Sequence, residues 1–182
     1  QTDRSEPAID HHSRITMHKE ARQHYNATFS PEKYQAFLDT VNTAFGEACT
    51  FRVSETPIFV PQSLKSQLLQ GVEDICAVIT QPGFRARSEA ALPAHLRVPG
   101  EDDHTVFLQL DFGVCRDAAG NFTPQLIEMQ GFPSLYFFQQ LLADSYRKHF
   151  EIPPHFHSLF GGLDREGYIQ LMREVIVGGS KP

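Results

Sequence analysis

Two apolar segments separated by a short turn constrain this sequence more than any other feature. The first covers residues 106–112 and the second residues 126–130, and in both of them apolar and polar side chains alternate. Such alternation is typical of strands that bury one face and expose the other. Between them, Asp117-Ala-Ala-Gly120 is a turn sequence with a glycine available for positive φ. The sequence therefore predicts an antiparallel hairpin over residues 106–130.

This hairpin carries three oxygen-bearing side chains. Asp111 lies on the first segment, and Glu128 and Gln130 lie on the second. A simple register places Asp111 opposite roughly residues 126–128, so that the three side chains converge on one face. Two close carboxylates need a cation, a proton or solvent between them, and oxygen ligands of this kind suit Mg²⁺. Asp111, Glu128 and Gln130 are thus a candidate metal site, and the alternative is a wet strand face with solvated acids.

Helical periodicity accounts for most of the remaining sequence. Ser30-Pro31-Glu32 is a typical helix start, with a capping serine, a proline at the first helical position and an acid near the positive end. We expect an α+β fold in which a mainly antiparallel sheet, containing the 106–130 hairpin, packs with about four helices. Apolar residues recur at three- and four-residue steps in four segments, residues 30–46, 61–80, 135–150 and 164–177.

The domain organisation follows from the same pattern. Residues 1–29 are polar and rich in histidine, whereas residues 30–182 contain the strongly periodic segments. A chain of 182 residues is long enough to form one domain with a buried core, or two small lobes. We expect a polar N-terminal segment at residues 1–29, followed by a single α+β domain.

The segment from residue 82 to 105 is rich in proline, glycine and charge, which predicts a long connection or loop. Its arginines Arg85, Arg87 and Arg97 are candidates to bind the phosphates of a nucleotide or the carboxylate of a substrate. The alternative is that they are ordinary exposed loop arginines.

Composition excludes several classes of partner. A formal net charge of −6 argues against nucleic acid, because phosphate binding requires a basic surface. The basic residues are scattered and no apolar run reaches the roughly 18 residues needed to span a bilayer, so we expect no membrane association. Three widely spaced cysteines form no disulfide framework, and they favour reduced thiols in a cytoplasmic protein.

Two histidines near the C-terminus offer a second candidate chemistry. His155 and His157 flank Phe156, and in an extended segment both imidazoles would point the same way. A pair of this kind could hold Zn²⁺ in a metal hydrolase, although no third ligand is close in sequence. The alternative is ordinary polar surface.

The central hairpin also resembles a known family. Leu110-Asp111-Phe112, the turn, and then Pro124-Gln-Leu-Ile-Glu128-Met-Gln130-Gly-Phe-Pro133 are similar to the metal-binding hairpin of the ATP-grasp superfamily, found in D-alanine–D-alanine ligases and glutathionylspermidine-synthase-like proteins. The resemblance covers about thirty residues. It matches Asp111 to the first Mg²⁺ ligand, Glu128 to the bridging carboxylate and Gln130 to an asparagine. Glutamine keeps the amide oxygen but places it one methylene farther out.

The resemblance implies the circularly permuted branch of that superfamily, in which this hairpin precedes the nucleotide-binding lobe. The chain would be the N-terminal part of an ATP-dependent, Mg²⁺-dependent ligase that joins a small-molecule or peptide carboxylate to an amine. The rest of the parent chain would supply the nucleotide lobe, and the fragment alone would be inactive. The rival hypothesis is a non-catalytic binding or interaction domain that keeps a degenerate ATP-grasp-like scaffold.

Overall fold

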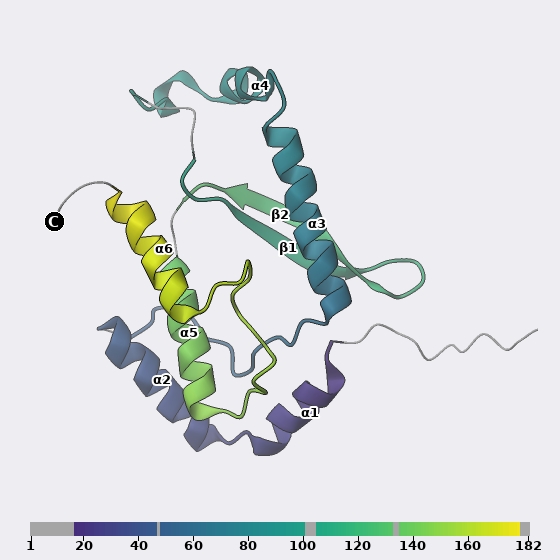
Figure 1. The fold of residues 1–182 in the computed structure, drawn as a ribbon, viewed down its shortest axis with the longest axis vertical. Helices are drawn as coiled ribbons and strands as arrows, with labels where there is room; N and C mark the ends of the chain where they lie inside the picture. Colours follow the sequence, from purple (N-terminus) through teal and green to yellow (C-terminus); the bar gives the residue numbers. More distant parts are fainter. Residues whose placement is uncertain (1–16, 47, 101–104, 133–134, 179–182) are drawn as a thin grey trace, which may run out of the picture. The chain divides into compact units, whose positions relative to one another are not determined.

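The computed structural model describes residues 17–46, 48–100, 105–132 and 135–178. It shows an α+β protein, as the sequence predicts, with six α-helices, one short 3-10 helix and one two-stranded antiparallel sheet in those residues. None of the described helices is long and apolar enough to cross a membrane. The elements are α1 (Lys19–Thr28), α2 (Pro31–Phe45), α3 (Gln62–Ile79), α4 (Phe84–Ala91), η1 (Ala94–Leu96), β1 (Gln109–Arg116), β2 (Phe122–Gln130), α5 (Tyr136–His149) and α6 (Arg165–Val177), shown in Figure 1.

The described residues form two compact units, each assembled from segments that are distant in sequence. The first unit contains α3, α4, η1 and the hairpin from residue 110 to 128. The second contains α1, α2, α5 and α6, together with residues 97–109 and 129–135. α1 contributes Ala21 and Tyr25 to the core of the second unit. The domain organisation expected from the sequence stays a prediction.

In the first unit, α3 lies along the hairpin (Figure 1). The contact depends on Gly71 in the middle of the helix, because a Cβ at that position would lie 3.3 Å from the ring of Phe112. Glycine is unfavourable within a helix by about 1 kcal/mol relative to alanine, so close packing of the aromatic ring is the compensating gain. Leu64 near the start of α3 is almost completely buried.

The helix α4 corrects the expectation of an irregular connection after residue 82. Gly83 adopts a left-handed conformation with φ 79° and ends the preceding turn, and the helix begins at the next residue. Within it, Nε of Arg85 lies 2.6 Å from the carboxylate of Glu89 four residues on, a spacing that supports a short helix. The alanines of this segment also favour helix, a propensity that the nearby prolines and glycines mask in the sequence.

In the second unit, aromatic residues from α1, α2 and α5 form the core. Tyr25 of α1 and Phe37 of α2 are fully buried. The ring centre of Tyr25 lies 4.9 Å from that of Phe150, and the ring centre of Phe37 lies 4.5 Å from that of Tyr146 in α5. The expected polar N-terminal segment therefore contributes a core aromatic through α1, while residues 1–16 lie outside the described residues.

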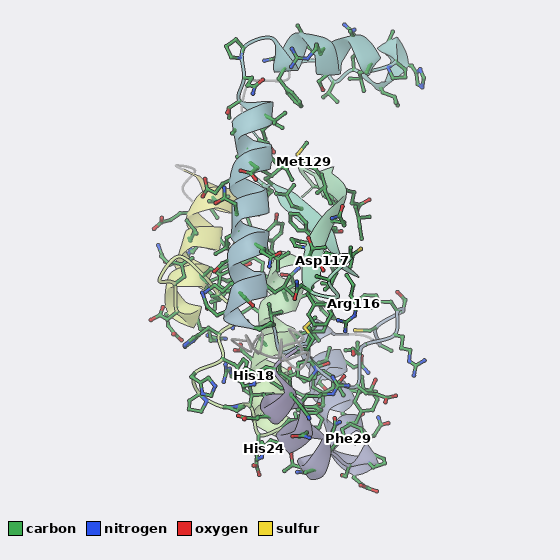
Figure 2. The ribbon with its side chains drawn as sticks, turned by 90° about the vertical axis from the view of Figure 1, so that its right-hand side faces the viewer. His18, His24, Phe29, Arg116, Asp117 and Met129 are labelled. Atoms are coloured by element: carbon green, nitrogen blue, oxygen red, sulfur yellow. The ribbon has the colours of Figure 1, made fainter. Side chains whose placement is uncertain are left out.

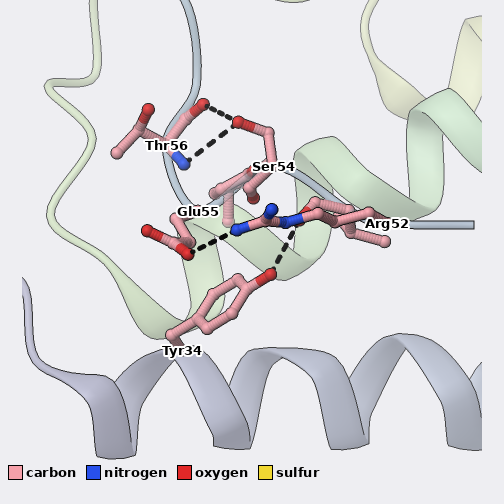
Figure 3. A network of polar contacts seen from close by, with 7 residues as sticks. Tyr34, Arg52, Ser54, Glu55 and Thr56 are labelled. Carbon is pink, nitrogen blue, oxygen red and sulfur yellow. Dashed lines mark hydrogen bonds and ion pairs between the residues drawn. The ribbon is translucent and has the colours of Figure 1, made fainter.

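Three tyrosine hydroxyls hold one extended segment of this unit in place. Tyr34 donates to the carbonyl of Val53 at 2.7 Å, and Tyr146 donates to the carbonyl of Ser54 at 2.5 Å. Tyr25 donates to the next carbonyl, that of residue 55, at 2.8 Å. Figure 3 shows this segment, with the Ser54 hydroxyl also bonded to the backbone two residues on. Each of these hydroxyls, from buried Tyr25 and from partly buried Tyr34 and Tyr146, thus satisfies a backbone acceptor that has no strand partner.

Candidate functional site

The turn of the hairpin sets the pairing of β1 and β2. The amide of Gly120 donates to the carbonyl of Asp117 at 2.9 Å, and the amide of Asp117 donates to the carbonyl of Asn121 at 2.9 Å. Gly120 has φ 85°, a conformation that glycine adopts without steric cost. This is a three-residue hairpin loop with a glycine at the left-handed position. Figure 2 shows Arg116 and Asp117 at this end of the hairpin.

Contacts farther along the strands agree with the same register. The Arg116 guanidinium carbon lies 4.4 Å from the ring centre of Phe122, directly across the pair. A Cβ at Gly113 would lie 3.5 Å from the side chain of Ile127, so these two residues share a face. The antiparallel hairpin predicted from the sequence is therefore present, with its turn at the expected residues.

This register decides how the two predicted carboxylates relate. Counted outward from the turn without interruption, Asp111 lies opposite Ile127 and Leu110 lies opposite Glu128. Because side chains alternate between faces, that count places Asp111 and Glu128 on opposite faces. β2 has nine residues against eight in β1, and in this register the ninth is Gln130 at the end of the strand. The predicted convergence would require a β-bulge at Ile127–Glu128, where both residues would face Asp111.

The third predicted ligand stands at the end of the strand. Gln130 is the last residue of β2 and is partly buried, whereas Glu128 is exposed and Asp111 is partly buried. Within the described residues, no group of three or more His, Cys, Asp and Glu side chains is placed to hold a metal ion. A divalent cation on this hairpin would therefore depend on two carboxylates and an amide, with water or phosphate oxygens completing its shell. Mg²⁺ is the cation that such a sparse set suits.

The three arginines predicted to bind phosphate are not gathered on one element. Arg85 and Arg87 both lie on α4, but residues two apart on a helix point to different sides. Arg85 pairs with Glu89, which partly neutralises its charge. Arg97 follows η1 and belongs to the second unit, whereas α4 belongs to the first. Their role in nucleotide binding stays a prediction.

The histidines predicted as a metal pair lie in the second unit. The ring centre of His155 is 6.5 Å from that of His18, which caps the start of α1, and both imidazoles pack beside Phe156. Figure 2 shows His18 at the start of α1 and His24 farther along it. His24 instead lies 3.0 Å from the carboxylate of Glu151. A zinc site needs at least three protein ligands. The part of the chain that the structure describes contains no group of three His, Cys, Asp or Glu side chains placed to hold a metal, so His155 and His157 have no third ligand there.

Sequence reasoning missed a small charged pocket in the second unit. It lies beside α5 and the start of α6, and Gln140, Asp144, Arg147, His157 and Arg165 are among the residues that line it. The signals in the sequence were the polar residues at positions 140 and 144, four apart on one helix, and the adjacent opposite charges at 164 and 165. Neither signal indicates a shared cavity, because the residues are up to 25 positions apart.

Comparison with known proteins adds no relative. No protein-family model matches the sequence, and no significant match was found among curated proteins or among solved structures.

Proposed function

We propose that this chain supplies the Mg²⁺-binding hairpin of an ATP-grasp-type ligase that joins a carboxylate to an amine. The observation that carries the proposal is the hairpin itself: Asp111 and Glu128 lie on neighbouring antiparallel strands of one unit, joined by the expected turn. With Gln130 at the end of the second strand, these residues provide two carboxylates and one amide oxygen. The proposal requires a β-bulge at Ile127–Glu128, because the register counted from the turn places the two carboxylates on opposite faces.

The chain's own residues have limited roles in this proposal. Asp111 and Glu128 would hold the cation, and the cation would offset the negative charge of ATP phosphates during acyl-phosphate formation. Gln130 would add a neutral oxygen with a longer reach than the asparagine of the family pattern. Arg85, Arg87 or Arg97 would contact phosphate or the substrate carboxylate. The rest of the parent chain would supply the nucleotide lobe.

The test is a titration of this chain with Mn²⁺, which replaces Mg²⁺ at oxygen sites and whose free form is detected by electron paramagnetic resonance. We expect Asp111→Asn and Glu128→Gln each to raise the dissociation constant for Mn²⁺ by roughly tenfold or more, a loss typical of impaired metal coordination. Glu73→Gln is the matched control, because Glu73 is an exposed acid on α3 of the same unit. Unchanged Mn²⁺ affinity in both hairpin variants would refute the metal site.

A second candidate function is a non-catalytic interaction domain, and the exposed apolar side chains of the hairpin favour it. Ile127 is 70% exposed and Leu126 is 49% exposed, although strands normally bury one face. Such a surface suits the docking of a protein partner or of another part of the parent chain. This function is the better explanation if two results are obtained. The titration detects no Mn²⁺ binding, and Ile127→Lys abolishes binding of this chain to the rest of the parent chain when the two are expressed as separate polypeptides.

A further inference from the structure

A pocket of about 250 Å³ in the second unit has the chemistry of a small-molecule site. It is formed by α5, the segment that follows α5, and the first turn of α6, all of which belong to one unit. Its volume lies below the range of roughly 300–1,000 Å³ that is typical of sites for drug-sized ligands. Any ligand that fits inside must therefore be small.

The charged groups of this pocket include both signs. Nε of Arg165 lies 2.8 Å from the Oδ2 atom of Asp144, and Arg147 donates a hydrogen bond to the carbonyl of Phe156. The carboxylate of Asp144 raises the pKa of Arg165 further above its ordinary value. A guanidinium has five N–H donors, and these contacts use only some of them, so both arginines keep donors for a ligand anion.

Gln140 supplies the observation that points most directly to a ligand. Its side chain is 8% exposed and lines the pocket, and its Nε2 atom donates to Oδ1 of Asp144 at 2.8 Å. The other end of the amide, Oε1, is buried and has no hydrogen-bond partner among the described residues. Buried polar atoms are nearly always paired, so a donor on a ligand bound beside Gln140 would satisfy this acceptor.

These features together select the class of ligand. We propose that the pocket binds a small zwitterion, and specifically a free α-amino acid. Its carboxylate contacts the guanidinium groups of Arg147 and Arg165, and its ammonium group donates to Oε1 of Gln140 and to the carboxylate of Asp144. An anion alone would leave Oε1 without a donor, and a cation alone would leave the remaining guanidinium donors of Arg147 and Arg165 unused. This proposal is independent of the metal site on the hairpin.

The first experiment measures binding by isothermal titration calorimetry, with glycine, L-alanine, L-serine, L-glutamate and L-lysine as probes. Acetate and methylammonium, each of which carries one half of the zwitterion, are the matched small-ion probes. We expect at least one amino acid to bind at least tenfold more tightly than either half. Binding of acetate or methylammonium as tight as that of the best amino acid would overturn the proposal, and so would the absence of binding by all five amino acids.

The second experiment locates the site with variants. Gln140→Leu keeps the approximate size of the side chain and removes both the unpaired acceptor and the hydrogen bond from Nε2 to Asp144, and circular dichroism checks that the variant folds. We expect Gln140→Leu and Arg165→Gln each to weaken binding of the best amino acid by roughly tenfold or more. Arg173→Gln, an exposed change on the same helix, should leave affinity unchanged. Native affinity in both pocket variants, or equal weakening by Arg173→Gln, would overturn the assignment.

Discussion

Asp117 shows how one side chain determines the geometry of the hairpin. Its carboxylate accepts from the backbone amide of Asn121 at 2.8 Å and from the Asn121 side-chain amide at 3.2 Å. Its own backbone carbonyl accepts from Gly120, so the residue closes the loop with both its main chain and its side chain. The register of both strands, and with it the placement of Asp111 and Glu128, is counted from this residue.

The pH dependence of this turn follows from the same bonds. The hydrogen bonds from Asn121 lower the pKa of Asp117 from its ordinary value of 3.8. Because the folded-state pKa is depressed, the stabilisation is fully present above pH 3.8 and is lost as the pH falls through the folded pKa. We expect amide hydrogen exchange at Asn121 to accelerate over that range, relative to exchange within α2. Asp117→Ala should remove this dependence, and an unchanged profile in that variant would assign it to another group.

At the scale of elements, α2 and α5 are held together by aromatic side chains. Phe37 of α2 is fully buried against Tyr146 and Phe150. Beside this contact, Oγ1 of Thr40 and Nε2 of His149 lie 2.8 Å apart, which adds one polar link between the helices. Sequence periodicity predicted the inward face of each helix, but the helix that each face would contact depended on the fold.

Removing the central aromatic of this pair should be costly. We expect Phe37→Ala to lower the free energy of unfolding of the second unit by about 3–5 kcal/mol, because the surroundings of a fully buried ring relax only partly into the cavity. Phe137→Ala is the matched control on α5, since the ring of Phe137 is 48% exposed, and its cost should be about 1 kcal/mol or less. Urea denaturation measures both values, and equal losses would contradict the proposed packing.

At the scale of the whole molecule, each unit combines segments from distant parts of the sequence. The second unit unites α1 and α2 with α5 and α6, and the segments of the first unit lie between them in sequence. The three tyrosine hydroxyls that bind residues 53–55 come from α1, α2 and α5. Stability of the second unit therefore depends on neutral phenols in its interior.

This dependence predicts a loss of stability at alkaline pH. Burial raises the pKa of Tyr146 from 10.0 to about 12, with a further increase from nearby Tyr34, and burial also raises the pKa of Tyr25. These pKa values are raised on folding, so the stabilisation is full below pH 10 and is lost as the pH rises from 10 towards 12. Urea denaturation across that range should show the decline, and Tyr146→Phe should reduce its slope. A slope that is the same in both proteins would exclude Tyr146 as a cause.

The sequence by itself determined the features that depend on neighbours in the chain. The hairpin turn, the start of α2 at Ser30-Pro31 and the α+β class all follow from local hydrogen bonding, backbone preference and periodicity. The tertiary structure alone decided which faces meet, because register and packing depend on residues that are far apart in sequence. It set a register that, counted from the turn, places Asp111 and Glu128 on opposite faces of the hairpin. It also brought Gln140 and Arg165, 25 positions apart, to one pocket whose chemistry no local pattern contains.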